Sequence, residues 1–274
     1  FISEQAKNDI ISTWDSDELT MRRDGKPHIK SGLVYKEYDS NIHLIDSFDY
    51  IKWVKREPQR FELHEGIDPH TRTPHHWLRF LYDKKNNILY VVDELKAPYE
   101  SMLIEDYARL IKAKRQGYYP LYTQIDTSSQ TPDVIHKVHS NTGEFMEDIH
   151  TIRTQFEKNG ISTILCTKDN NIGINAVKSR LKVVKTKDGQ IKRNPKLYIF
   201  NTLAGIRYEL KRYSWDSYAS DMIAEKKEKI NRVLKKDDHF LDILKYEAIK
   251  LSNDFNMSDK PIVNELKMII PNMY

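Results

Sequence analysis

The chain alternates between short apolar runs, which are typical of strands, and longer segments whose apolar residues recur at helical spacing. Three apolar runs, at residues 60–68, 75–83 and 87–95, follow one another closely, and the turn KKNN separates the last two. This pattern predicts three antiparallel strands. A pair of short strands is expected just before them, at residues 33–39 and 41–48.

Beyond the third strand, the pattern changes to alternating helix and strand. Helices are expected at residues 100–117, 143–160, 173–181 and 202–213, and strands at residues 121–125, 161–167 and 196–200. A last helix is expected to start near Asp238. An Asp-Gly pair within the basic stretch 182–193 predicts an additional β-hairpin. The whole order indicates a mixed α/β fold with helices on both faces of one sheet.

The composition is that of a globular domain with a heavily charged surface. Of 274 residues, 39% are apolar and 31% charged, while 9 Phe, 4 Trp and 16 Tyr can supply a core. Neither a run of 18 apolar residues nor a signal-peptide pattern is present, so no membrane role is expected. The single cysteine, Cys166, excludes an internal disulfide and a Cys-rich zinc site. We expect a domain at residues 31–255, preceded by a linker remnant at 1–30 and followed by a tail at 256–274.

Positive charge is concentrated in one part of the chain. The net charge is only +4, yet residues 178–196 contain eight Lys or Arg and one Asp. Such a segment indicates contact with a polyanion, although a solvated lysine-rich hairpin is also possible. The candidate contacts are Lys182, Lys185, Lys187, Lys192 and Arg193.

Carboxylates occupy the ends of two expected strands. Asp68 ends the first of the three antiparallel strands, and Asp126 ends the strand that follows the crossover helix. Each could be an ordinary turn aspartate, but two such strands can lie side by side and parallel. Converging carboxylates repel each other unless a cation lies between them, and Mg²⁺ or Mn²⁺ suits such oxygen ligands.

The start of the last helix is a third source of candidate ligands. Asp238, His239 and Asp242 lie within two turns, so Asp242 can share a helix face with either of the others. A helix cap would account for Asp238 alone. Glu94, at the end of the third antiparallel strand, is a further candidate. A zinc site of His70, His75 and His76 is disfavoured, because their spacing matches no zinc motif.

The order of these segments resembles the ribonuclease-H-like nucleases, and more closely the C-terminal nuclease domain of the large terminase subunit of tailed bacteriophages. The resemblance rests on GLVYKEYDSNIHLIDSF, GID, LYVVDELK, YTQIDTSS and DDHFLDILKY, in that order along the chain. It implies a central sheet of the five-stranded type flanked by helices. It also implies that Asp68, Asp126 and Asp242 bind two Mg²⁺ or Mn²⁺ ions, with Asp68 bridging them and His239 beside them.

By the same resemblance, the expected activity is two-metal-ion endonuclease cleavage of double-stranded DNA during viral genome packaging, in the cytoplasm of an infected bacterium. The expected partners are an N-terminal ATPase domain, the portal and the small terminase subunit. The chain has no G-x-x-x-x-G-K-[ST] phosphate loop. It departs from the family pattern at Ile243, where alanine is usual, and at Lys245, where arginine is usual. A junction resolvase, an integrase and a non-catalytic DNA-grip or portal-docking module are the alternatives.

Overall fold

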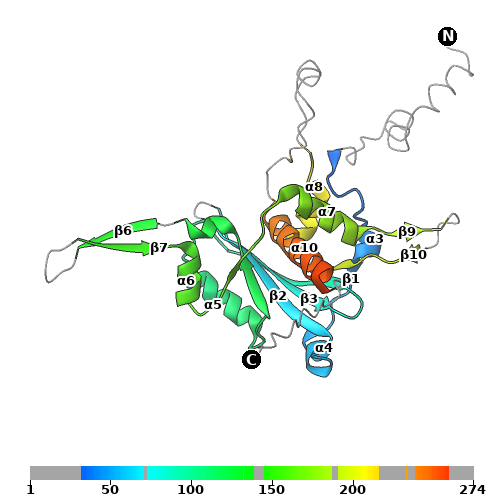
Figure 1. Cartoon of the computed structure of the whole chain (residues 1–274), viewed down its shortest axis with the longest axis horizontal. Helices are drawn as coiled ribbons and strands as arrows, with labels where there is room; N and C mark the ends of the chain where they lie inside the picture. The colour runs from blue at the N-terminus through cyan, green and yellow to red at the C-terminus, as the bar shows by residue number, and fades with distance from the viewer. Residues whose placement is uncertain are drawn as a thin grey trace, which may run out of the picture.

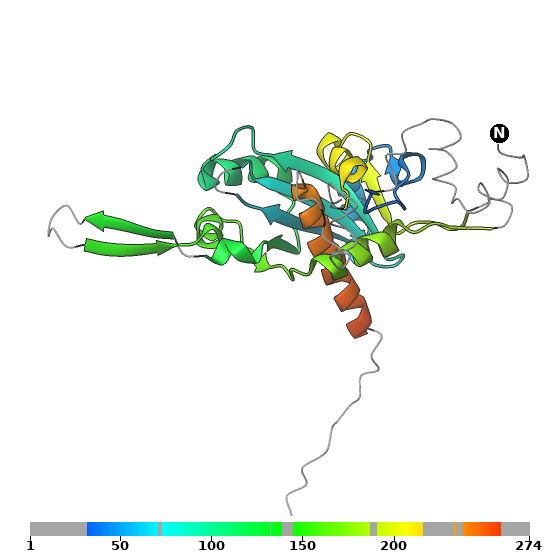
Figure 2. The same cartoon turned by 90° about the horizontal axis from the view of Figure 1, so that it is seen from above.

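The computed structural model describes residues 32–70, 73–131, 133–138, 145–186, 191–215, 233 and 238–258. The largest sheet in this part of the chain has seven strands in the order β1-β11-β4-β3-β2-β5-β8, with helices on both faces (Figures 1 and 2). The expected mixed α/β fold is confirmed, and β11 and β1 extend the five central strands at one edge. The expected linker at 1–30 and residues 259–274 of the expected tail lie outside the described residues, whereas residues 256–258 belong to the last helix.

The three antiparallel strands form the centre of the sheet. They are β2 (Phe61–Asp68), β3 (His76–Asp83) and β4 (Ile88–Lys96), and each lies within one residue of its expected bounds. Strand β3 pairs with β2 on one side and with β4 on the other. All its residues are buried, because packed elements cover both faces of the sheet.

Two parallel strands extend the sheet beyond β2. Helix α5 (Ile104–Arg115) leads to β5 (Tyr122–Ile125), which pairs in parallel with β2. Helix α6 (Ile152–Lys158) leads to β8 (Ile164–Leu165), which pairs in parallel with β5. Helices α5 and α6 cover one face through a core that includes Trp77, Tyr107 and Phe156. The crossover therefore places β5 beside β2, as expected.

The other face carries α7 (Asn170–Leu181), α8 (Ala204–Arg212) and α10 (His239–Ser258). Strand β11 (Leu197–Phe200) pairs in parallel with β4, and β1 (Leu44–Ile45) pairs with β11. The expected basic hairpin is present as β9 (Val184–Lys185) and β10 (Ile191–Arg193). None of the described helices is long and apolar enough to span a membrane.

The expected strand pair at residues 33–48 is wrong. Leu33 forms only an isolated bridge with Ser214. The chain then enters the short helix α3 (Ser40–His43), because the Asp39 side chain accepts a hydrogen bond from the backbone N–H of Asn41. Only β1 is a strand, and α4 (Tyr50–Arg56) follows it.

The single helix expected at residues 143–160 is also wrong. Residues Phe145–His150 form β7, which pairs with β6 (Asp133–Val138) in a hairpin that projects from the body (Figure 1). The helix starts only after Thr151, whose side chain accepts a hydrogen bond from the backbone N–H of Thr154 at 3.0 Å. A local capping box therefore sets the helix start within an otherwise periodic segment.

Helix α10 approaches β2 very closely at Gly66. A Cβ atom built on Gly66 would lie 2.3 Å from Cγ2 of Ile243, so the isoleucine side chain occupies the space that any other residue would need. The isoleucine that replaces the usual alanine is thus accommodated by a glycine on the facing strand. This contact lies two residues before Asp68 and one residue after Asp242, so it sets the distance between the two segments.

A buried polar network holds the same helix one turn further along. The Glu247 carboxylate lies 2.7 Å from Nδ1 of His64 and accepts hydrogen bonds from the Tyr122 hydroxyl and the Gln124 amide. Burial alone would lower the pKa of His64, but the adjacent Glu247 and Glu62 carboxylates raise it to about 9. His64 is therefore protonated at neutral pH, and its contact with Glu247 ties α10 to β2 and β5.

The contact at Gly66 makes a testable prediction. Gly66→Ala should lower the free energy of unfolding by about 1–3 kcal/mol, because the added methyl overpacks against Ile243. In an Ile243→Ala background the same substitution should cost less, since the clashing methyl group is gone. Urea denaturation measures both, with Gly32→Ala as the control because Gly32 has open space around its Cβ position. An equal cost in both backgrounds would contradict this account of the helix position.

Candidate metal centre and nucleic-acid interface

Asp68 and Asp126 lie next to each other at one edge of the sheet. Asp68 is the last residue of β2, and Asp126 follows β5 directly. The two strands are parallel and Ile67 is opposite Ile125, so the next residue on each strand carries a carboxylate. Both aspartates are buried. The chain turns after Asp126 into the 3₁₀ helix η2 (Thr127–Gln130), because its carboxylate accepts the backbone N–H of Ser128 at 2.7 Å.

The first two turns of α10 bring further polar side chains to this edge. His239 Nδ1 lies 3.0 Å from an Asp68 oxygen, and the Tyr246 hydroxyl donates to Asp126 at 2.6 Å. Burial raises the pKa of Tyr246 far above its usual value, and the charges of Asp242, Asp126 and Asp68 raise it further. Helix α10 thus contacts both Asp68 and Asp126 directly, whereas the convergence of Asp242 with them on one metal centre stays a prediction.

Protonated side chains compensate the negative charge of these aspartates. Burial opposes ionisation of Asp68, but hydrogen bonds from His239 and His70 hold its pKa below the usual value. Burial likewise opposes ionisation of Asp126, yet Lys168, Tyr246 and Ser128 lower its pKa to about 2. Asp242 pairs with Lys245 at 2.5 Å. The expected repulsion between bare carboxylates is thus already offset by side-chain cations.

His70, which the sequence analysis considered only as part of a disfavoured zinc site, is a candidate ligand beside Asp68. Its Nε2 lies 2.8 Å from Asp68, and its ring contacts that of His239 edge-on at 4.3 Å. Donor atoms of Asp68, His70 and His239 all lie within 4.8 Å of one another, close enough to hold one cation. The only sequence signal was its position two residues after Asp68.

The other two histidines of the disfavoured zinc site have separate roles. His75 accepts the backbone N–H of His70 on Nδ1 and donates from Nε2 to the Met102 carbonyl. His76 stacks on His239 at 4.5 Å, where burial and the nearby His239 lower its pKa to about 3. Both histidines stay neutral at pH 7. His75 holds the backbone of His70, and His76 packs against the ring of His239.

The secondary metal candidates have other contacts. Glu94 accepts the backbone N–H groups of Gly205 and Ile206 at 2.7 and 3.0 Å, so it caps the start of α8. Asp238 is buried just before α10, and its carbonyl accepts the backbone N–H of Asp242 at 2.9 Å. In this structure Glu94 therefore has a structural role, which is to hold the start of α8.

Two further residues at this edge were missed in the sequence. Lys168, which lies between β8 and α7, donates to Asp126 at 2.8 Å. Lys245, the departure from the usual arginine, donates to Asn170 at 2.6 Å and to the Tyr213 hydroxyl at 2.9 Å besides pairing with Asp242. Both are isolated lysines in a lysine-rich chain, so no spacing distinguishes them from surface residues.

The basic hairpin leaves the body at the end of α7. Lys182 and Arg193 are exposed at its base. Lys185 and Lys192 lie on its two strands, without a described side-chain position, and Lys187 lies outside the described residues. Its contact with a polyanion stays a prediction.

Comparison with solved structures places this arrangement in a fold class. The fold is that of the ribonuclease-H-like nucleases. It is similar to the large terminase from a thermophilic bacteriophage, with a TM-score of 0.55, 16% identity, and coverage of 91% of this chain and 52% of that one. It is also similar to the P22 large terminase nuclease domain, with a TM-score of 0.54, 14% identity, and coverage of 81% and 93%.

The chain thus has the fold of large-terminase nuclease domains and spans about half the length of the thermophilic phage protein. No protein-family model matches it, and no curated protein sequence does. At these identities the likeness establishes the fold, so the chemistry of the site rests on its own residues.

The low pKa of Asp126 predicts how its carboxylate affects the stability of the metal-free protein. Asp126→Asn should lower the free energy of unfolding by about 1–2 kcal/mol at pH 7 in chelator, because the low pKa of Asp126 shows that the fold favours its ionised form. This contribution is fully present above about pH 4, the usual pKa of an aspartate, and is lost as the pH falls toward 2. The gap between the two proteins should therefore shrink on acidification.

Urea denaturation at several pH values measures this gap. Asp106→Asn is the matched control, because Asp106 pairs with Arg109 on the outer side of α5. If Asp126→Asn were more stable than the wild type without metal, repulsion among the aspartates would dominate instead.

Proposed function

We propose that this chain is a metal-dependent endonuclease domain that cleaves double-stranded DNA during phage genome packaging. The observation that supports this most strongly is that the buried carboxylates of Asp68 and Asp126 end the neighbouring parallel strands β2 and β5, with His239 at the start of α10 in contact with Asp68. The likeness of the fold to large-terminase nuclease domains supports the packaging role.

The side chains at this edge fit a divalent cation. Three carboxylates offer hard oxygen donors, and His70 and His239 add imidazole nitrogens within reach of Asp68. The Lys168 ammonium now supplies positive charge beside Asp126, where a bound ion would bring it. Two ions, as we propose, would polarise the scissile phosphate and lower the pKa of an attacking water.

The protein residues have distinct roles in this proposal. Asp68, at the end of β2, would be shared by the two ions, and Asp126 and Asp242 would each hold one. Tyr246 and the backbone N–H of Ser128 orient the Asp126 carboxylate by hydrogen bonds. Lys168, about half exposed, can turn from Asp126 toward a DNA phosphate when a metal ion takes its place.

The alternatives differ in substrate. A resolvase or integrase relative would prefer branched or end-processed DNA, whereas a packaging nuclease should cut linear and supercoiled duplex with little sequence preference. A DNA-grip or portal-docking module would bind DNA or protein without cutting. The ATPase domain, the portal and the small terminase subunit belong to the proposal as partners.

The first test removes one carboxylate at a time. Asp68→Asn, Asp126→Asn and Asp242→Asn should each reduce plasmid cleavage in Mn²⁺ or Mg²⁺ by about 100-fold or more. Replacing residues that merely support a metal ligand already costs about 10–100-fold, and a direct ligand should cost at least as much. Cleavage is followed on agarose gels with and without chelator.

Asp106→Asn serves again as the control and should cleave like the wild type. Circular dichroism checks that each variant is folded. If two of the three aspartate variants kept wild-type cleavage, the carboxylates would be structural and the nuclease assignment would fail.

The second test separates the two histidines from the carboxylates. His70→Ala and His239→Ala should weaken Mn²⁺ binding by about 10-fold and Mg²⁺ binding less, because Mg²⁺ makes little use of nitrogen ligands. Isothermal titration of each metal into the purified protein measures this directly. Equal losses for both metals, or none, would show that the histidines only shape the charge around Asp68.

A further inference from the structure

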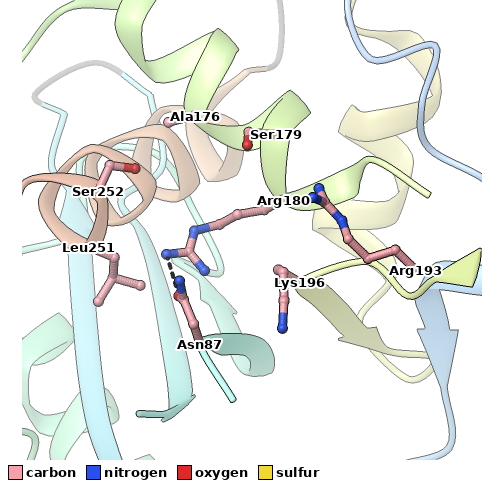
Figure 3. Close-up of a pocket in the computed structure, with 8 residues that line it drawn as sticks. All are labelled: Asn87, Ala176, Ser179, Arg180, Arg193, Lys196, Leu251 and Ser252. Atoms are coloured by element: carbon pink, nitrogen blue, oxygen red, sulfur yellow. Dashed lines mark hydrogen bonds between the residues drawn. The ribbon is translucent and has the colours of Figure 1, made fainter. Parts of the chain in front are cut away.

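A second polar cavity lies at the far end of α7 from Lys168. Its volume is about 290 Å³, and its lining comes from four segments of the chain: the β3–β4 turn, α7, residues 193–196 and α10. Figure 3 shows Arg180 extending from α7 toward Asn87 in the β3–β4 turn, with Arg193 and Lys196 beside it. Ser179 and Ser252 contribute hydroxyl groups at the rim.

Arg180 is buried in this cavity with unused donors. Only 7% of the residue is exposed, and its Nη2 donates to the Asn87 side-chain oxygen at 3.2 Å. Its Nε and Nη1 are buried and have no hydrogen-bond partner among the described residues. A guanidinium stays charged even when buried, so a buried one without an anion is costly to the fold.

The surrounding charges do not supply that anion. Each charged residue that lines the cavity in the described part of the chain is basic, namely Arg180, Arg193 and Lys196. Burial lowers the pKa of Arg180, and the Tyr82 hydroxyl and the Glu247 carboxylate only partly oppose this. Glu247 is already engaged by His64, Tyr122 and Gln124.

The cavity is also held in shape before any ligand binds. The backbone N–H of Lys196 donates to the Arg180 carbonyl at 2.6 Å, and the Lys196 ammonium donates to the Asn86 carbonyl at 2.7 Å. The Tyr82 hydroxyl donates to the same Asn87 oxygen that accepts from Arg180. The base of the hairpin, the end of α7 and the β3–β4 turn are therefore fixed around the guanidinium.

We propose that this cavity is a binding site for a phosphate group, separate from the carboxylate cluster. Phosphate oxygens can accept hydrogen bonds from the unused Arg180 donors and from the Ser179 hydroxyl together, while the Ser252 hydroxyl already donates to the Ala248 carbonyl at 2.8 Å. The volume also leaves room for part of a sugar attached to the phosphate.

The position of the cavity favours the backbone of bound DNA as the source of that phosphate. The basic hairpin β9–β10 starts and ends at its rim. The twelve residues of α7 span about 18 Å, which matches roughly five base pairs of duplex. This assignment to DNA rests on the proposed function, whereas the phosphate site itself does not.

The first experiment uses the full chain in chelator, so its outcome does not depend on cleavage. Without added phosphate, Arg180→Met should be as stable as the wild type or more stable, because it removes a buried unpaired charge. Inorganic phosphate at constant ionic strength should raise the melting temperature of the wild type by a few degrees and leave Arg180→Met unchanged. Arg109→Met, an exposed change on α5, should respond like the wild type.

The second experiment identifies the source of the phosphate. If it belongs to DNA, Arg180→Met should weaken binding of a short duplex about 10-fold and reduce the slope of log K against log salt by about 0.9. The site would instead belong to a free nucleotide if Arg180→Met left the salt slope of duplex binding unchanged but bound deoxyadenosine monophosphate more weakly than the wild type does. The double variant Arg193→Met and Lys196→Met, which changes the exposed Arg193 and the half-buried Lys196, repeats both tests with Arg180 unchanged.

The proposal fails if the wild type, Arg180→Met and the double variant Arg193→Met and Lys196→Met all respond alike. The compared quantities are the melting temperature in phosphate and the affinities for the mononucleotide and the duplex. Failure of the cleavage assays with these binding results intact would overturn the nuclease proposal and leave the phosphate site standing.

Discussion

The close approach of α10 to β2 is the constraint on which the candidate site depends. Gly66 leaves the space that Ile243 fills, and the buried pair of His64 and Glu247 holds the next turn of the same helix. These two contacts bring segments that are far apart in the chain to one edge of the sheet. His239 reaches Asp68 because the helix lies directly on the strand, so the packing of α10 also sets the position of this polar contact.

Charge compensation is the second organising feature. Aspartates placed together would repel one another, yet hydrogen bonds from His70, His239 and Lys168 hold the pKa values of Asp68 and Asp126 below their usual range. The site is thus built to keep its carboxylates ionised. In the proposed function, an incoming divalent ion would take the place of the Lys168 ammonium beside Asp126 rather than relieve bare repulsion. At the other end of α7 the balance is reversed, since Arg180 is a buried cation with no anion among the described residues that line its cavity.

Much of this architecture could be predicted from the sequence because it follows from local rules. Alternating apolar runs gave the central strands, and the crossover rule placed Asp68 beside Asp126. Local capping was harder to anticipate: Asp39 starts a helix and Thr151 delays one, so residues 33–48 and 143–160 were misassigned. Contacts between side chains that are far apart in the chain could not be predicted from the sequence. Nothing in the spacing of Lys168, Glu94 or Arg180 indicates a site cation, a helix cap or a buried unpaired charge, because each role depends on a segment distant in the chain.

The central claim is that the three aspartates form a metal centre, and the location of bound Mn²⁺ tests it most directly. Crystals of the protein soaked in Mn²⁺ would be measured near the manganese absorption edge, where anomalous scattering marks the metal alone. The account predicts anomalous peaks between Asp68 and the carboxylates of Asp126 and Asp242, with Lys168 turned away from Asp126. Absence of a peak at this edge of the sheet, or a peak confined to another part of the surface, would contradict it.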